Sequence, residues 1–195
     1  MNAHAEAKAR LRKEILDARN LLRPVEIADK SAIIMSKIIE QKVFCTSQTL
    51  MCYMDFRNEV MTGAFIRSCL RMGKKVSVPK VVKGLSGQRE MIAVEIKDTA
   101  ESFQTGSFGI LEPVEGAGRR VTPGEIDLII VPGVAYDYKR HRMGYGAGFY
   151  DRFLKDVKAD CVKIGVGFDI QIRAALPAEA HDIPMDLVIT ESRII

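Results

Sequence analysis

The sequence predicts an α/β fold: a mostly parallel sheet with helices on both faces, arranged as a three-layer αβα sandwich. Short apolar runs rich in Val, Ile and Leu recur along the chain, as in strands that are buried on both faces. Segments with helical apolar spacing lie between several of these runs, and such alternation is typical of parallel sheets. The 195 residues fit one domain, so we expect residues 1–195 to form a single domain.

The first two expected elements are helices, over residues 6–22 and from Pro24 onward. The first helix has an apolar stripe that consists of Leu11, Ile15, Ala18 and Leu22. A neighbouring stripe of cations consists of Lys8, Arg12 and Arg19. Like charges on one helix face repel each other, so these cations either bind an anion or form a solvated basic face. From the residues alone, the solvated face is the favoured interpretation.

The later elements alternate between strands and helices. We expect strands at residues 49–54, 75–78, 89–96, 128–131, 163–168 and 187–190, and a helix over residues 62–72. Pro79 should end the second strand, and residues 107–116 should form an irregular excursion that crosses the edge of the sheet. Loops at the ends of parallel strands often bind ligands, which makes Glu59 a candidate, although a lone loop glutamate is more often solvated.

The most informative stretch runs from residue 127 to residue 154. A buried strand is followed by a basic loop, by glycines at positions 144, 146 and 148, and by the amphipathic start of a helix, FYDRFL. Glycines let the backbone approach a ligand, and a helix N-terminus presents free N–H groups, so this order predicts an anion-binding loop. Arg142 is placed to add a charge-assisted contact. A flexible surface turn is the alternative interpretation.

Two well-known nucleotide motifs are excluded. A dinucleotide-binding fingerprint requires a third glycine at the position of Phe149, and the chain contains no Gly-x-x-x-x-Gly-Lys-Ser/Thr sequence. Asp151 follows the glycines, where a carboxylate either complements the helix dipole or holds a Mg²⁺ ion that arrives with phosphates. Position alone favours the dipole interpretation.

Composition narrows the class of protein. A net charge of +4 suits anionic small molecules but is low for nucleic acid, which usually needs a basic face with interleaved aromatics. No run reaches the roughly 18 apolar residues of a membrane span, and the charged start lacks the apolar centre of a signal peptide, so we expect a cytoplasmic protein. The four cysteines lie in apolar surroundings and suggest reduced residues near the core, with neither zinc nor disulfides.

The segments VPGVAYD and RMGYGAGFYDRFL resemble the signature of the 5-formyltetrahydrofolate cyclo-ligase family. The resemblance extends to residues 8–12, to Glu59, to FGILEP at residues 108–113 and to HDIPMD at residues 181–186. It implies an ATP- and Mg²⁺-dependent cyclisation of 5-formyltetrahydrofolate to 5,10-methenyltetrahydrofolate, with release of ADP and phosphate. In the family's scheme, the formyl oxygen attacks the γ-phosphate and a folate nitrogen then attacks the activated carbon. We expect a monomeric single-domain cyclo-ligase that binds neither nucleic acid nor membranes.

The resemblance also implies roles for individual residues. The ATP site would comprise Lys8, Arg12, Arg142, Met143, Gly144, Tyr145, Gly146, Ala147, Gly148, Phe149 and Tyr150, with Arg142 and Tyr150 as the catalytic residues. The folate site would comprise Met54, Glu59, Tyr145, Gly146, Ala147, Gly148 and Phe149. The Mg²⁺ ligands would be Asp151, now favoured as a metal ligand, and Asp182, with Asp186 as a competitor for the second place.

Some positions depart from the family pattern. Residues 138–141 stand where many relatives carry a glycine turn, which leaves the conformation of this loop open. Tyr145 stands where some relatives have arginine, so one phosphate contact is either a hydroxyl here or absent. None of the three histidines, at positions 4, 141 and 181, is assigned to catalysis. Two alternatives remain: a sugar-phosphate or acyl-CoA enzyme on a similar scaffold, which would not need ATP, and a non-enzymatic nucleic-acid-binding protein with salt-sensitive affinity.

Overall fold

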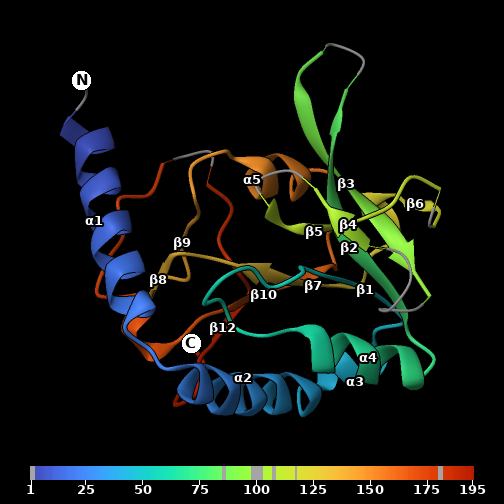
Figure 1. Ribbon diagram of the computed structural model, residues 1–195, viewed down its shortest axis with the longest axis horizontal. Helices are drawn as coiled ribbons and strands as arrows, with labels where there is room; N and C mark the ends of the chain where they lie inside the picture. The colour runs from blue at the N-terminus through green and yellow to red at the C-terminus, as the bar shows by residue number, and fades with distance from the viewer. Residues whose placement is uncertain (1–2, 85–86, 98–102, 107–108, 117, 180–181) are drawn as a thin grey trace.

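The computed structural model describes residues 3–84, 87–97, 103–106, 109–116, 118–179 and 182–195. Its centre is a seven-stranded sheet with the order β12–β10–β7–β1–β2–β3–β6 (Figure 1). The strands from β12 to β2 are parallel to their neighbours, whereas β3 and β6 pair antiparallel at one edge. This arrangement confirms the predicted α/β class and the mostly parallel sheet.

The strands of this sheet are β1 (Thr49–Cys52), β2 (Lys75–Lys83), β3 (Arg89–Ile96), β6 (Arg120–Val121), β7 (Leu128–Pro132), β10 (Val162–Val166) and β12 (Leu187–Ile189). The helices are α1 (Ala3–Asn20), α2 (Pro24–Ile39), α3 (Lys42–Thr46), α4 (Gly63–Arg71) and α5 (Phe149–Phe153), with short 3-10 turns at Pro123–Glu125 and Asp169–Gln171. Two small sheets complete the fold: β4 (Phe103–Thr105) with β5 (Leu111–Pro113), and β8 (Ala135–Asp137) with β9 (Arg142–Met143) and β11 (Ile172–Arg173).

Both faces of the central sheet are buried, which explains the continuous apolar run of β7. Leu128 and Ile130 pack into the core under α2, α3 and α4, which lie together below the sheet in Figure 1. Ile129 and Val131 pack into a second core with Phe153 of α5. Side chains of a strand alternate between its two faces, so a strand between two cores needs an apolar residue at every position. Because α5 is short, irregular segments complete the second covering layer.

Helix α1 stands at one end of the molecule and packs on the small sheet of β8, β9 and β11 (Figure 1). Ile15 is fully buried there, and Arg19, one turn further along, is only 2% exposed. Lys8 and Arg12 are partly buried. These four positions follow the i, i+4, i+7, i+11 spacing of one helix face, so the basic stripe lies on the inner side of α1. The favoured interpretation of a solvated basic face was therefore wrong.

Some predicted boundaries were also wrong. Strand β2 continues through Pro79, because β1 pairs with β2 only as far as Ser77 and leaves that side of the proline without a ladder in this sheet. The predicted excursion contains strand β5, and Ser107 and Phe108 lie outside the described residues. All four cysteines are free thiols, but Cys45 is exposed and does not lie near the core. Among the described residues, no helix is both long and apolar enough to cross a membrane.

Candidate active site

The loop between β1 and α4, residues 53–62, holds Glu59 in a fixed and buried position. The hydroxyl of Tyr53 donates to the carbonyl oxygen of Val60 over 2.7 Å, which closes the loop on itself. Glu59 is only 7% exposed, and its Oε2 accepts a hydrogen bond from the backbone N–H of Phe56 at 3.1 Å. A solvated loop glutamate would be free of such contacts, so that alternative is excluded. Met54, in the same loop, packs partly buried against the main core.

A chain of hydrogen bonds joins Glu59 to the segment of residues 144–148, which we name the glycine loop, and to α1. The hydroxyl of Tyr145 donates to Oε1 of Glu59 at 3.0 Å and accepts from Nη2 of Arg19 at 2.8 Å. The three residues come from three separate segments of the chain. Arg19 was not among the predicted site residues, and its place on the basic stripe was the only signal in the sequence that could have indicated it.

Burial raises the pKa of the Glu59 carboxyl above its usual value, because an ionised carboxylate loses hydration inside the protein. The charge of Arg19 and the hydrogen bonds from Phe56 and Tyr145 act in the opposite direction and lower this pKa. Burial and the neighbouring Glu59 likewise raise the pKa of the Tyr145 hydroxyl, so that the phenol stays protonated and able to donate. The carboxylate depends on its immediate partners to remain charged.

The glycine loop has a backbone conformation that favours glycine. Gly146 has φ +102° and Gly148 has φ +66°, both in the region that other L-residues rarely adopt. Arg12 of α1 donates from Nε to the carbonyl oxygen of Gly144 at 2.9 Å, and Arg152 donates to the carbonyl oxygen of Ala147 at 3.0 Å. Both ends of the loop are therefore held, which argues against a flexible surface turn.

Arg142 lies in strand β9, directly before the glycine loop, and not in the predicted basic loop. Its side chain is only 5% exposed, and Nη2 is 3.0 Å from Oδ1 of Asp151 in α5. The guanidinium carbon lies 5.4 Å from the ring centroid of Tyr150, whose hydroxyl pKa is raised well above its ordinary value by burial. Nε of Arg142 is buried without a hydrogen-bond partner in the described structure. A buried donor without a partner is rare in proteins, so the Nε–H group of Arg142 is a candidate to bind an anion.

Asp137, at the end of β8, builds the turn that leads to β9. Its carboxylate is fully buried and accepts from the backbone N–H groups of Lys139, His141 and Leu176, each at 2.9 Å. The ring Nδ1 of His141 lies 3.0 Å from the second carboxylate oxygen. His141 is thus a structural partner, whereas His181 and the side chain of His4 lie outside the described residues. Nothing in the local sequence distinguishes Asp137 from a surface aspartate.

The turn from β8 to β9 contains no glycine, and one of its residues has a left-handed backbone conformation. Arg140 has φ +65°, a left-handed conformation that is uncommon for residues with a side chain. Its backbone N–H donates to the carbonyl oxygen of Asp137, and its carbonyl oxygen accepts from Met185. These hydrogen bonds hold Arg140 in a left-handed conformation that strains its backbone.

Of the two remaining metal-ligand candidates, Asp182 lies near Lys8 of α1 and Asp186 does not. Nζ of Lys8 donates to Glu179 at 2.7 Å and lies 3.7 Å from Oδ2 of Asp182. Asp186 instead accepts from the backbone of Lys163 and forms an ion pair with its side chain at 2.7 Å. Within the described ranges, no three His, Cys, Asp or Glu side chains are grouped so as to hold a metal ion. A metal here would need ligands from the substrate.

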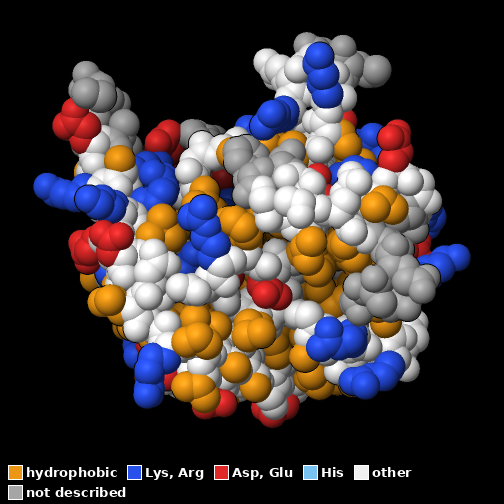
Figure 2. All heavy atoms as spheres, in the orientation of Figure 1, with side chains coloured by type: hydrophobic (Ala, Val, Ile, Leu, Met, Phe, Trp, Pro, Cys, Tyr) orange, Lys and Arg blue, Asp and Glu red, His pale blue; other side chains and the backbone are white. Residues whose placement is uncertain are grey.

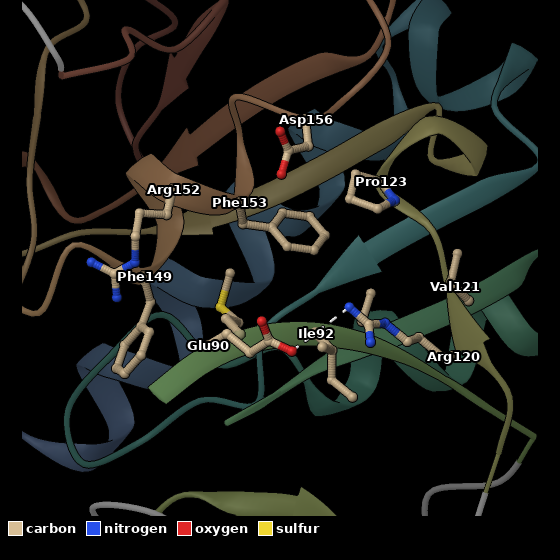
Figure 3. A pocket seen from close by; sticks show the side chains of 11 residues that line it. Glu90, Ile92, Arg120, Val121, Pro123, Phe149, Arg152, Phe153 and Asp156 are labelled. Carbon is tan, nitrogen blue, oxygen red and sulfur yellow. Dashed lines mark ion pairs between the residues drawn. The ribbon is translucent and has the colours of Figure 1, made fainter. Parts of the chain in front are cut away.

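Lys and Arg side chains lie on α1 and in the area between α1 and α5, with acidic side chains among those of α1, as Figure 2 shows. A separate cavity of about 290 Å³ lies beside α5 (Figure 3). Phe149, Arg152 and Phe153 line it, together with β3 and β6, and Glu90 and Arg120 form a 3.9 Å ion pair across it. Neither α1 nor Glu59 contributes to its walls, but Phe149 directly follows the glycine loop and Arg152 donates to this loop, so the cavity adjoins the hydrogen-bonded site.

Known proteins are similar to this chain over nearly its whole length. A profile of the 5-formyltetrahydrofolate cyclo-ligase family matches residues 4–191. A probable 5-formyltetrahydrofolate cyclo-ligase from Caenorhabditis elegans is 30% identical over 203 residues, covering 100% of this chain and 98% of the relative. The 5-formyltetrahydrofolate cyclo-ligase of Mus musculus is 28% identical, covering 95% and 94% of the two chains.

Solved structures give the same result. The 5,10-methenyltetrahydrofolate synthetase of Aquifex aeolicus has a TM-score of 0.83 and 36% identity, covering 96% of this chain and 91% of the other. The Mycoplasma pneumoniae synthetase, with a TM-score of 0.74 and 24% identity over 94% and 98% of the chains, supports the fold alone. The chain therefore belongs to the 5-formyltetrahydrofolate cyclo-ligase family.

Proposed function

We propose that this chain catalyses its family's reaction at the site formed by α1, Glu59 and the glycine loop. The reaction is the ATP-dependent cyclisation of 5-formyltetrahydrofolate to 5,10-methenyltetrahydrofolate, with release of ADP and phosphate. One observation carries the proposal: the glycine loop binds Glu59 through Tyr145 and binds Arg12 through the carbonyl oxygen of Gly144. Both substrates must meet in this reaction, and here one loop joins a carboxylate suited to folate with cations suited to phosphate.

On the folate side, Glu59 would recognise the pterin. An ionised carboxylate accepts two neighbouring N–H groups in parallel, and the edge of a pterin presents such a pair. The partly buried Met54 would supply an apolar wall. The backbone from Tyr145 to Phe149 would then face the formyl end of the folate.

On the nucleotide side, Lys8, Arg12 and Arg142 would bind the phosphates together with residues 143–150. The formyl oxygen attacks the γ-phosphate, the folate nitrogen then attacks the activated carbon, and phosphate leaves as the ring closes. Positioned cations suffice for such a step, because phosphoryl transfer depends mainly on alignment and charge stabilisation. Arg142, with its unpartnered buried Nε, would stabilise the developing charge. Tyr150, protonated at neutral pH, would help to fix the Arg142 guanidinium through its ring.

Asp151 and Asp182 would hold Mg²⁺. Carboxylate oxygens are suitable ligands for this ion, and Mg²⁺ is commonly bound by one or two carboxylates together with substrate phosphates. When bound, the ion would neutralise charge on the phosphates. Asp151 forms an ion pair with Arg142, so a metal bound at Asp151 would free this guanidinium for the nucleotide, whereas Lys8 would keep its shorter contact with Glu179. Asp182 lies near Lys8 of α1, whereas Asp186 pairs with Lys163 of β10, and this place beside a proposed phosphate-binding cation supports Asp182 as the second ligand.

We also propose that residues 1–195 act as one domain and as a monomer in the cytoplasm. The family match along residues 4–191 supports the single domain. Sedimentation at several protein concentrations tests the monomer, because a dimer would sediment faster as concentration rises. On the described residues, no observation favours the sugar-phosphate, acyl-CoA or nucleic-acid alternatives.

The deciding assay is the near-ultraviolet absorbance of methenyltetrahydrofolate that appears from 5-formyltetrahydrofolate with and without ATP. Glu59→Gln should raise the KM for folate about tenfold and leave the KM for ATP unchanged, because a charged hydrogen bond is lost. Arg142→Ala should lower kcat by roughly 10²–10³, as expected for a lost transition-state contact. Asp151→Asn should increase the Mg²⁺ concentration required for half-maximal rate. The exposed Arg10, replaced by Gln, serves as the control on α1.

Two results would refute the proposal. The first is the absence of ATP-dependent product from the wild-type protein. The second is unchanged kinetics in both the Arg142 and the Asp151 variants. An effect of Glu59→Gln on ATP, without an effect on folate, would place the pterin elsewhere.

A further inference from the structure

Arg19 is a buried cation that has no role in the proposed reaction steps. It is 2% exposed, its Nη2 donates to the Tyr145 hydroxyl at 2.8 Å, and its Nε has no hydrogen-bond partner in the described structure. A buried guanidinium is costly unless an anion compensates its charge. The nearest compensation along its hydrogen bonds is Glu59, which is reached through the Tyr145 hydroxyl.

We propose that Arg19 is a positioning residue for folate recognition, which acts through Tyr145 to keep the Glu59 carboxylate ionised and fixed in place. This inference rests on the proposed function, because it concerns the carboxylate assigned to the pterin. Arg19 touches no reacting atom. Its effect reaches the substrate through a charge and through the orientation of one hydroxyl.

The direction of the hydrogen bonds supports this role. A tyrosine hydroxyl has one proton to donate, and Arg19 is a donor without acceptor capacity. Because Tyr145 accepts from Arg19, its own proton is directed to Oε1 of Glu59. Phe56 N–H occupies one position on Oε2. Each carboxylate oxygen thus keeps acceptor capacity for one N–H of a pterin, whereas a protonated Glu59 would present a donor against a donor.

The charges around Glu59 also support a role of Arg19 in keeping this carboxylate ionised. The titratable and charged groups that face it are Arg19 from α1, Tyr145 from the glycine loop, Asp55 and Tyr53 from its own loop, Tyr136 from β8 and Tyr150 from α5. Burial raises the pKa of Glu59, Asp55 raises it further, and the positive charge of Arg19 lowers it. Removal of Arg19 should therefore raise the Glu59 pKa, so that folate binding fails at a higher pH than in the wild type.

The experiment compares Arg19→Gln, Arg19→Lys and the control Arg10→Gln. Calorimetry without nucleotide gives the Kd for 5-formyltetrahydrofolate from about pH 4.5, close to the ordinary glutamate pKa, up to about pH 8.5. Arg19→Gln should weaken binding at neutral pH about tenfold and leave the KM for ATP unchanged. The acidic limb of the profile, the pH range in which affinity falls as Glu59 is protonated, should move to higher pH. Arg19→Lys retains the charge and should keep the acidic limb near that of the wild type. A merely structural role would not separate Gln from Lys in this pH profile.

A double-mutant cycle tests whether Arg19 affects folate binding through Glu59. If Arg19 acts through Glu59, Arg19→Gln should have little further effect on folate affinity in the Glu59→Gln background, because coupled residues are not additive. Equal effects in both backgrounds would overturn the inference, as would an unmoved acidic limb. Should Arg19→Gln fail to fold, Tyr145→Phe breaks the same link and should shift the limb in the same direction.

Failure of the inference and failure of the function give different results. If the wild-type protein neither binds 5-formyltetrahydrofolate nor forms product from it with ATP, the proposed function is wrong. If it does both and the Arg19→Gln and Tyr145→Phe variants keep the wild-type pH profile, only the role of Arg19 is wrong.

Discussion

Asp137→Asn tests whether the buried turn before β9 positions the catalytic loop. The Asp137 carboxylate is 0% exposed, with Lys139 and His141 N–H groups on one oxygen and Leu176 N–H and the His141 ring on the other. Asparagine has the same shape, but it replaces one oxygen by an NH₂ group. The NH₂ group of asparagine then faces the N–H groups that bound the replaced oxygen, so these buried N–H groups lose their acceptor.

The magnitude follows from the bonds lost. A hydrogen bond to a charged group contributes about 1.5–3 kcal/mol, so the loss of two such bonds at one oxygen should lower the free energy of unfolding by about 3–6 kcal/mol. For a domain of this size, each kcal/mol lowers Tm by roughly 2–4 °C, which gives a fall of roughly 6–24 °C. Such a loss is a large fraction of the stability of an ordinary domain.

The loss should depend on pH. Burial alone raises the pKa of Asp137, but the hydrogen bonds from Leu176 and His141 outweigh burial and hold the pKa below its usual value. A carboxyl group with a lowered pKa in the folded state contributes stability above its unfolded pKa of about 3.9, and this contribution is lost as pH falls through the folded value. The difference between wild type and variant should therefore be full at neutral pH and shrink below about pH 4.

Urea unfolding, followed by circular dichroism, measures this difference as a shift of the midpoint at constant slope. Asp160→Asn is the matched control, because the Asp160 side chain is 82% exposed and its variant should stay within about 0.5 kcal/mol of the wild type. If Asp137→Asn also stays within about 1 kcal/mol at neutral pH, the carboxylate is not the centre of the turn and the reasoning is refuted.

Two further predictions concern backbone conformation. Gly146→Ala should weaken nucleotide binding about tenfold, because φ +102° strains a residue with a side chain by about 1–3 kcal/mol; the KM for ATP measures this, and Gly124→Ala, whose new Cβ would meet nothing within 4 Å, should leave it unchanged. An equal effect of both variants would contradict the role of the conformation. Arg140→Val should be about 1–2 kcal/mol less stable than Arg140→Gly in urea, since φ +65° disfavours a β-branched residue; equal stabilities would show that the turn relaxes freely.

The sequence predicted the large sheet well because burial leaves a local signal. The run at Leu128–Val131 is apolar at every position since cores lie on both sides of β7. The small sheet left no such signal. Strand β9 has only two residues, and β8 pairs with β11 about 35 positions along the chain. Periodicity cannot reveal strands of two or three residues, so the segment before the glycines was predicted to be a loop.

The same limit applies to the site. The glycines, Arg142 and Asp151 were identified because they are adjacent in sequence, but the partners that hold them are distant. Glu59 and Tyr145 are 86 positions apart, and Arg19 and Tyr145 are 126 positions apart. The spacing of α1 placed Arg19 on a basic stripe, yet spacing cannot tell which side of a helix faces the protein. Docking of α1 on the small sheet decides that, and the small sheet was not predicted.

The structure bears on whether the Tyr145 hydroxyl can replace the phosphate contact expected of an arginine at this position. Its hydroxyl is engaged by Arg19 and Glu59, so it faces the carboxylate assigned to folate and has no proton left for a phosphate oxygen. In the proposed nucleotide site, backbone N–H groups of the glycine loop would therefore contact the phosphates, and Arg142 and α1 would supply the charge. A loop that places its side chain toward one substrate and its backbone toward the other can bring the two together without a long catalytic side chain of its own.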